Sequence, residues 1–166
     1  MALSTSAALN DFDSTGLQNV ISFTPTGSLD LADDAFSSSI AVTETTLDNS
    51  TTKAPFARLV FSAIDGFTLG TWDSVPQVKV YMQVVEADGT NDEPEPDATY
   101  PGRYVGRFLV DQSTSAQYIQ SENLISMAGV KKCKFFIENK TGASIDDDNT
   151  SGWKVQAELM SYAPKA

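Results

Sequence analysis

The sequence predicts an all-β protein, an antiparallel β-sandwich of jelly-roll type. Three observations predict it. About eight short apolar or alternating runs recur along the chain. Clusters of Gly, Pro, Asn, Asp and Ser separate these runs, and almost no stretch has the periodicity of a helix. Many short strands at regular spacing are typical of two packed sheets, with a small closed barrel as the alternative.

The first half of the chain predicts four strands, over residues 18–24, 37–43, 56–64 and 77–85. The run FARLVFSAI is apolar on both faces, which is typical of a central strand. The run QVKVYMQVV alternates strictly, so we expect one face in the core and the other in water or against a partner. Residues 28–36 suit a short helical turn or a loop, and residues 45–54 a polar loop closed by Pro55.

The second half predicts four more strands, over residues 104–110, 116–120, 131–139 and 153–160. Gly106 inside the first of these predicts a bulge or a close backbone approach. In the last strand we expect four side chains to point one way, into the core: Trp153, Val155, Ala157 and Leu159. The acidic segment 86–99 predicts a long exposed loop, and loops of this length are usually functional or mobile.

Charge and composition restrict the partners that the protein can have. The chain of 166 residues has 11 basic and 22 acidic side chains, which gives a formal net charge of −11. Such a surface disfavours nucleic acid and anionic membranes and suits a basic partner. The first ten residues lack the pattern of a signal peptide, and no apolar run is long enough to span a membrane, so we expect synthesis in the cytosol.

The residue types in the chain give little support for a catalytic site. The chain has no histidine and a single cysteine, Cys133, which excludes an internal disulfide and which we expect to be a small buried side chain. No zinc site, phosphate loop or serine–histidine pair can be built, and we expect no cofactor and no enzyme activity.

Three weaker hypotheses remain open beside the structural one. Calcium could bind the acidic loops at Asp146–Asp148 or at Asp88–Glu93, although neither spacing fits an EF-hand. Glu138 and Glu158, on predicted strands, could act as paired carboxylates of a glycoside hydrolase. Aromatic side chains could form a sugar-stacking platform: Trp72, Tyr81, Tyr100, Tyr104 and Tyr118.

Residues 100–153 carry a resemblance to a known class of protein. They read GRFLVDQSTSAQYI, then GVKKCKFFIENKTGASI, then a terminal strand that opens at Trp153. This succession of a strand, a polar link ending in Gln-Tyr, a basic entry, an aromatic strand ending in Glu-Asn and a Thr-Gly turn resembles small virion proteins of tailed bacteriophages. The resemblance covers about a third of the chain.

The resemblance implies a structural protein of the virion, most specifically a capsid decoration, or cement, protein made in the host cytoplasm. Such a protein binds the major capsid protein on the outer capsid surface as a homo-oligomer, a trimer or dimer. The alternative is a carbohydrate- or receptor-binding module from a phage tail.

The predicted domain organisation is a polar N-terminal arm, residues 1–16, followed by a single sandwich domain, residues 17–166. An arm that becomes ordered on binding would enlarge the contact area of a small domain. We therefore expect the partner interface on the arm, on the acidic loop and on the rigid corner that follows it. Its predicted residues are Leu3, Leu9, Phe12, Glu93, Tyr100 and Tyr104.

Overall fold

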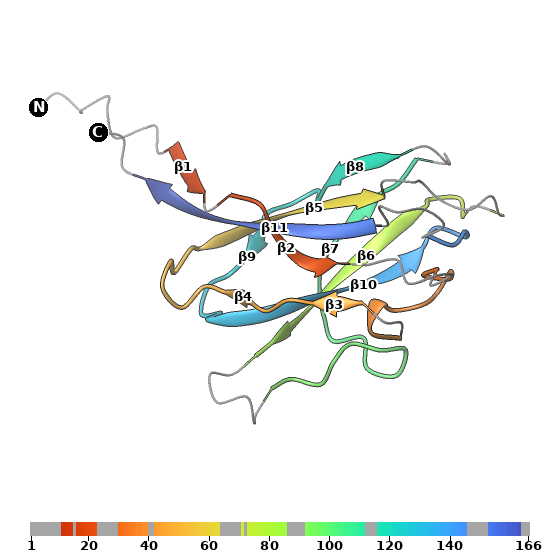
Figure 1. The fold of residues 1–166 in the computed structure, drawn as a ribbon, viewed down its shortest axis with the longest axis horizontal. Coiled ribbons are helices and arrows are strands. Elements are labelled where there is room, and N and C mark those ends of the chain that lie inside the picture. The colour runs from red at the N-terminus through yellow and green to blue at the C-terminus, as the bar shows by residue number, and fades with distance from the viewer. Residues whose placement is uncertain are drawn as a thin grey trace, which may run out of the picture.

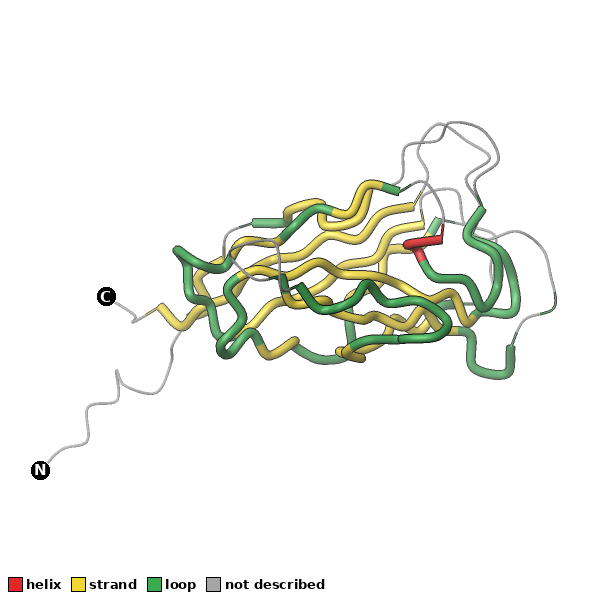
Figure 2. Tube along the Cα trace, turned by 90° about the horizontal axis from the view of Figure 1, so that it is seen from below, coloured by secondary structure: helices red, strands yellow, loops and turns green. Residues whose placement is uncertain are grey.

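Two antiparallel sheets packed face to face make up the fold, which we describe from a computed structural model (Figure 1). The structure describes residues 11–14, 16–22, 30–39, 42–63, 71, 73–85, 92–111, 116–145 and 153–163. The strands run along the long axis of the molecule (Figure 2).

The larger sheet has seven strands. Its main order is β3 (Thr43–Glu44), β2 (Gln18–Ser22), β11 (Trp153–Ala163), β5 (Phe56–Ala63) and β8 (Gln117–Gln120). In addition, β1 (Asp11–Ser14) pairs with the end of β11, and β9 (Ile125–Ser126) pairs with the start of β5.

The smaller sheet has four strands. Their order is β4 (Leu47–Asp48), β10 (Lys132–Lys140), β6 (Gln77–Val84) and β7 (Arg103–Leu109). The predicted all-β antiparallel sandwich is therefore confirmed. Its jelly-roll connectivity stays a prediction.

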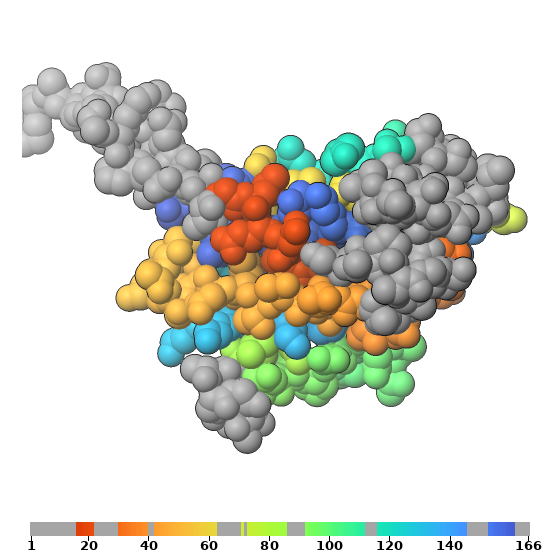
Figure 3. Space-filling model, viewed as in Figure 1, coloured from red at the N-terminus to blue at the C-terminus, as the bar shows by residue number. Residues whose placement is uncertain are grey.

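One side of the sandwich is closed by the chain itself. Strand β3 belongs to the larger sheet and β4 to the smaller one, so the chain changes sheets between Glu44 and Leu47. In the space-filling view, the yellow-orange segment that includes these strands runs between the two sheets (Figure 3).

The core lies between the sheets and contains the side chains that alternation predicts. Trp153, Val155, Ala157 and Leu159 of β11 are all at most 1% exposed, as expected for one face of a strand. Across the core, Phe61 of the larger sheet stacks on Phe108 of the smaller one, with ring centroids 5.5 Å apart. Cys133 is fully buried there, and burial raises the pKa of its thiol to about 12, so it stays protonated at neutral pH.

Most of the predicted strands are confirmed. The bulge predicted near Gly106 is present, because the register of β6 and β7 shifts between Val80, opposite Gly106, and Tyr81, opposite Tyr104. The strand predicted over residues 37–43 is wrong. Its first three residues form a 3₁₀ turn, Ser37–Ser39, because the Ser39 amide and hydroxyl both bond to the Phe36 carbonyl oxygen.

Two other expectations also need correction. The polar loop predicted over residues 45–54 contains β4, which pairs with Lys132 and Cys133. The second face of β6, predicted to be wet or against a partner, is partly buried within this chain. Tyr81 is 7% exposed and Gln83 is 4% exposed. Two segments of the chain itself cover this face.

Candidate partner-binding face

The outer face of the smaller sheet lies beneath two segments without regular strands. We call them the first cover segment, residues 30–39, and the second cover segment, residues 92–100. They bury side chains of β6 and β10 that would otherwise face solvent, among them Tyr81, Phe136 and Glu138. The covered face is therefore a small second core outside the sandwich.

The first cover segment is attached along the edge of β10. The Asp34 amide donates a hydrogen bond to the Asn139 carbonyl oxygen at 2.8 Å, and the Asn139 amide donates one to the Ala35 carbonyl oxygen at 3.0 Å. The ring of Phe36 then turns over the face and packs on Tyr81, with centroids 5.4 Å apart. Below the turn, the Ser37 hydroxyl accepts a hydrogen bond from the Ile137 amide.

A network of buried hydrogen bonds around the Asn139 side chain secures this attachment. The Asn139 side-chain amide donates to the carbonyl oxygens of Leu31, at 2.8 Å, and Ala143, at 2.7 Å. Its carbonyl oxygen accepts from the amide and the hydroxyl of Thr141. Since Asn139 and Thr141 are both fully buried, these bonds replace the ones that water would have made.

The second cover segment is attached to the end of β6. The Glu93 amide donates to the Val84 carbonyl, and the Glu93 carboxylate accepts from the Val84 amide at 2.9 Å. The Gln83 side chain donates to the Glu93 carbonyl oxygen. A segment predicted to be an exposed loop therefore folds back on the sheet where it can be described, from Asp92 onward.

A tight corner ends this segment. The Asp97 carboxylate accepts from the amides of Thr99 and Tyr100, both at 2.7 Å, and the Asp97 amide donates to the Tyr100 carbonyl. Gly102 follows with φ +72°, and a Cβ atom there would lie 2.9 Å from the Pro96 ring. The corner thus requires glycine for its backbone conformation and for its packing.

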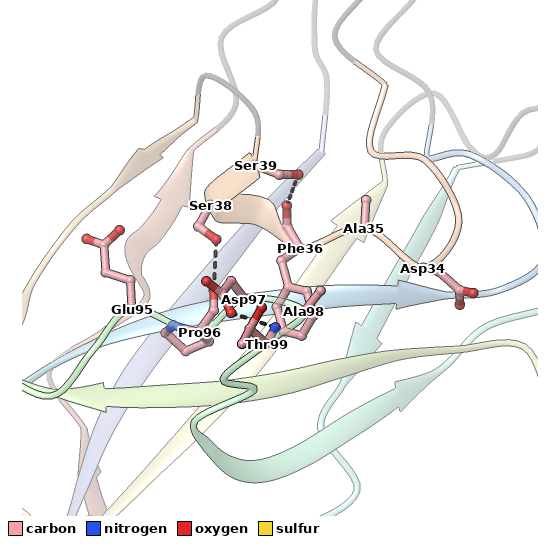
Figure 4. A pocket seen from close by; sticks show the side chains of 10 residues that line it. All are labelled: Asp34, Ala35, Phe36, Ser38, Ser39, Glu95, Pro96, Asp97, Ala98 and Thr99. Carbon is pink, nitrogen blue, oxygen red and sulfur yellow. Dashed lines mark hydrogen bonds between the residues drawn. The ribbon is translucent and has the colours of Figure 1, made fainter.

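Between the two cover segments lies a pocket of about 460 Å³ (Figure 4). The Ser38 hydroxyl bridges its two walls by donating to the Pro96 carbonyl oxygen at 2.8 Å. In the close view, Asp34 and Glu95 stand at opposite ends of the pocket. Its volume is in the range of small-ligand sites.

A charge network runs along the floor of the covered face. The Tyr81 hydroxyl donates to the Glu138 carboxylate at 2.8 Å, and Lys79 and Lys140 lie 3.6 and 3.4 Å from the same carboxylate. Lys140 also pairs with Asp34 at 2.6 Å. Burial, followed by the bond to Glu138, raises the pKa of Tyr81. The Tyr81 hydroxyl therefore keeps its proton at neutral pH and can donate it to Glu138, which suits a structural role.

Glu44 differs from these groups. It lies on β3, beside the turn of the first cover segment, and accepts a hydrogen bond from the Ser37 hydroxyl at 3.0 Å. Burial raises the pKa of its carboxyl group to about 7; the Ser37 bond opposes the increase, Glu95 adds to it and Lys134 opposes it. Glu44 is thus a carboxyl group that changes charge near neutral pH.

Three of the six predicted interface residues lie on the second cover segment or on the strand that follows it. Glu93 pairs with Arg103 at 2.9 Å, Tyr104 of β7 packs on Tyr81 with centroids 5.8 Å apart, and Tyr100 ends the corner. Tyr100 and Tyr104 are 45% and 53% exposed, so both rings are available to a partner.

The described part of the predicted arm, residues 11–14, lies elsewhere. Phe12 belongs to β1, where its backbone is opposite Tyr162, and β1 projects with the end of β11 from one end of the molecule (Figure 1). Leu3 and Leu9 lie outside the described residues. Phe12 is therefore on a different sheet from Tyr104, which belongs to β7.

The structure also bears on the glycoside-hydrolase and sugar-platform hypotheses. Glu138 and Glu158 alternate with core residues of opposite sheets, so they occupy opposite outer faces and cannot flank one substrate. Tyr81 is buried, and Tyr118 lies on the larger sheet opposite Ser62, which excludes both from one platform with Tyr100 and Tyr104.

In the part of the chain that the structure describes, no group of three or more carboxylate or cysteine side chains could hold a metal ion. The predicted calcium residues Asp88 and Asp146–Asp148 lie outside the described residues. None of the described segments is a helix long and apolar enough to cross a membrane.

No family model, curated protein or solved structure matches this chain. The functional argument therefore depends on the residues themselves.

Sequence reasoning missed several residues of this face. The pocket wall at Phe36 and Ser38 and the half-buried carboxyl group of Glu44 come from stretches that were interpreted as a loop or a weak strand or were given no element. A run of polar and small residues carries no periodic signal, so only the tertiary contacts reveal these positions.

Proposed function

We propose that this protein is a structural protein of a tailed-bacteriophage virion, a capsid decoration protein that binds the outer surface of the major capsid protein. The observation that carries the proposal is the exposure of two tyrosines, Tyr100 on a corner that the Asp97 carboxylate fixes and Tyr104 on the strand β7 that follows it. The resemblance of residues 100–153 to virion proteins of tailed phages supports it.

The chemistry of the surface suits a protein partner. Tyrosine side chains provide large contact areas at a low cost in conformational entropy, and they are enriched at the centres of interfaces. The corner is fixed by Asp97, Pro96 and Gly102, so little further ordering is needed on binding. The net charge of −11 favours a basic capsid surface over nucleic acid or membrane.

In this proposal the protein acts by adding buried interface to the particle. A ligand that binds only the assembled state stabilises that state by mass action, without any chemical step. Decoration as a homo-oligomer, a dimer or trimer, would multiply the number of contacts at each site.

Co-sedimentation with undecorated phage capsids tests the proposal. We expect the protein to sediment with the capsids at a fixed, saturable number of copies per particle and to raise the temperature at which the capsids open. Light scattering of the free protein gives its oligomeric state. The proposal is wrong if the protein stays in the supernatant at every concentration tested.

The alternative function is a carbohydrate- or receptor-binding module from a phage tail. The pocket between the cover segments favours it, because carboxylates and hydroxyls at Asp34, Ser38 and Asp97 could accept and donate hydrogen bonds to sugar hydroxyls. A glycan screen separates the two functions. Binding of a defined glycan, lost on Asp97→Ala and unaffected by Tyr118→Ala, would favour the tail module.

A further inference from the structure

The side of the sandwich at β7 is open, whereas the chain closes the opposite side between β3 and β4. Strand β7 ends the smaller sheet and pairs only with β6. The larger sheet continues further on this side. Its strand β5 packs over β7 through the stacked rings of Phe61 and Phe108, and β8 and β9 pair with β5 beyond that contact. No described strand of the smaller sheet therefore lies opposite β8 and β9.

The backbone of β7 has hydrogen-bonding groups on its free edge. The Val110 amide donates to the Pro76 carbonyl oxygen at 3.1 Å, which makes these two residues a hydrogen-bonded pair of the antiparallel ladder. Such pairs alternate along a ladder, so the amide and carbonyl groups of Arg107 and Leu109 point away from β6. No partner for these groups occurs in the part of the chain that the structure describes. An unpaired strand edge of this kind is a template for one more strand.

A groove of about 350 Å³ lies between this edge and the larger sheet. Its apolar lining comes from Met82 and Val105 of the smaller sheet, Ile125 of β9 and Val130 after it. Met82, Ile125 and Val130 belong to the core and are at most 8% exposed, so the groove reaches the core between the two sheets. Leu124, which also lines it, is 41% exposed. Alternate side chains of a strand added to β7 would enter this groove.

The chain itself contains a segment whose sequence fits the groove. Residues 1–10, which precede β1 and lie outside the described residues, read MALSTSAALN. In a strand with this sequence, Leu3, Ala7 and Leu9 would share one face, and small or polar side chains would occupy the other. The segment has no charged side chain, which suits an apolar groove.

Strand β1 directs this segment away from its own body. The register places four residues side by side across the larger sheet: Ser14, Met160, Phe56 and Ser126. Ser126 lines the groove, so the groove lies at the end of the molecule from which β1 projects (Figure 1). Asp11 pairs with the end of β11, beyond the last pair between β11 and β5. Ten extended residues before Asp11 span at most about 33–36 Å, which is enough to cross to a neighbouring molecule.

We propose that residues 1–10 of one copy add as a strand to β7 of a second copy, with Leu3, Ala7 and Leu9 directed into the groove. The added strand pairs the free edge and covers the opening between the sheets. Reciprocal exchange makes a dimer, and exchange around a ring makes a trimer. The inference deepens the homo-oligomer of the proposed function. It also explains why the predicted interface residues Leu3 and Leu9 are far along the chain from Tyr104, which lines the groove.

Light scattering of the free, full-length protein, without capsids, tests the exchange. We expect a dimer or trimer that dissociates on dilution. Leu9→Asp places a charge in the apolar groove and should raise the dissociation constant at least about tenfold. Asn10→Asp is the matched control, because it adds the same charge on the opposite face of the added strand and should leave the dissociation constant unchanged.

A proline pair tests the receiving edge. Leu109→Pro removes an amide that points away from β6, so it should keep the fold and weaken association at least about tenfold. Tyr118→Pro is its control on the edge of the larger sheet. The Ser121 amide donates to the Leu59 carbonyl oxygen, so by the same alternation the Tyr118 amide also points away from its sheet. Tyr118→Pro should associate as the wild type does.

Hydrogen exchange locates the contact. The amides of Arg107 and Leu109 should exchange at least about tenfold more slowly in the associated wild type than in Leu9→Asp, because only the wild type pairs them with a partner strand. The Tyr118 amide should exchange at the same rate in both.

A free protein that is a monomer at every concentration tested overturns the proposal. So does equal association of Leu9→Asp and Asn10→Asp, or wild-type association of Leu109→Pro. If Leu109→Pro does not fold, the two arm variants, which leave β7 unchanged, decide the question. A protein that associates through the arm but ignores capsids defeats only the proposed function, whereas a monomer that binds capsids defeats only the strand exchange.

Discussion

The two sheets of this protein treat their outer faces differently. Among the described residues, the outer face of the larger sheet is open at Tyr118, which is 70% exposed, and at the exposed hydrogen bond between Gln156 and Asn19, and closed only locally, at Ser62 and Glu158. The outer face of the smaller sheet is buried under two segments and holds an aromatic cluster, a charge network and a pocket. A sandwich needs only one core, so the second layer indicates a face shaped for something besides stability.

The polar groups that hold the first cover segment should differ most in energy from those on the open part of the larger sheet. Asn139→Ala removes four hydrogen bonds from a fully buried position and leaves their partners unsatisfied. We expect the free energy of unfolding to fall by about 3 kcal/mol. Urea unfolding measures it, with Gln156→Ala as the control on the open face, expected to cost under about 0.5 kcal/mol. Equal losses would contradict the difference between the faces.

The corner of the second cover segment should be the next most sensitive place. Gly102→Ala combines φ +72° with a Cβ atom 2.9 Å from Pro96, so we expect a loss of about 2 kcal/mol in the free energy of unfolding and weaker particle binding. Gly129→Ala is the matched control, because it has φ +78° and open space around its Cβ position. It should lose about 1 kcal/mol and keep binding.

The raised pKa of Glu44 also predicts a pH dependence of stability. The pKa of its carboxyl group is about 7 in the folded protein, against an ordinary value of 4.5, so its contribution is full below about pH 4.5 and is lost as the pH rises through 7. Glu44→Gln, which cannot ionise, should therefore be more stable than the wild type at pH 8, by about 1–2 kcal/mol after allowance for solvent screening. Urea unfolding at pH 5 and 8 measures the difference; a variant less stable than the wild type at pH 8 would contradict the sign.

The smallest effect is expected for an exposed ion pair at the edge of the smaller sheet. Arg107 and Glu122 lie 3.0 Å apart, with side chains 37% and 40% exposed. Glu122→Gln should change the free energy of unfolding by less than about 0.5 kcal/mol, and less still in high salt. A loss above about 1 kcal/mol would show that the cover extends further than the described contacts indicate.

Sequence alternation predicted the sandwich well because burial acts on every second residue of a strand. The run from Trp153 to Leu159 has this pattern and buries the face that it predicts. The strand Phe56–Ala63, predicted to be central because it is apolar on both faces, lies between β11 and β8. The exposed corner at Tyr100 was also predicted, since Pro and Gly specify a turn locally.

The cover escaped prediction because its contacts are distant in sequence. Ser37 bonds to Ile137, one hundred positions away, and Ser38 bonds to Pro96. The same distance explains why Tyr81 was expected on an open face, because no residue near Tyr81 in the sequence indicates that Phe36 packs on it. The surroundings of Glu44 likewise include Ser37 and Glu95, which periodicity does not bring together.

The most direct test of the account compares two tyrosines on the two faces. Tyr104→Ala and Tyr118→Ala each remove an exposed ring from a strand, the first beside the cover and the second on the open sheet. Co-sedimentation with undecorated capsids should show binding weakened at least about tenfold by Tyr104→Ala and unchanged by Tyr118→Ala. Equal binding by both variants, or a loss confined to Tyr118→Ala, would contradict the assignment of the exposed Tyr104, beside the covered face, to the partner surface.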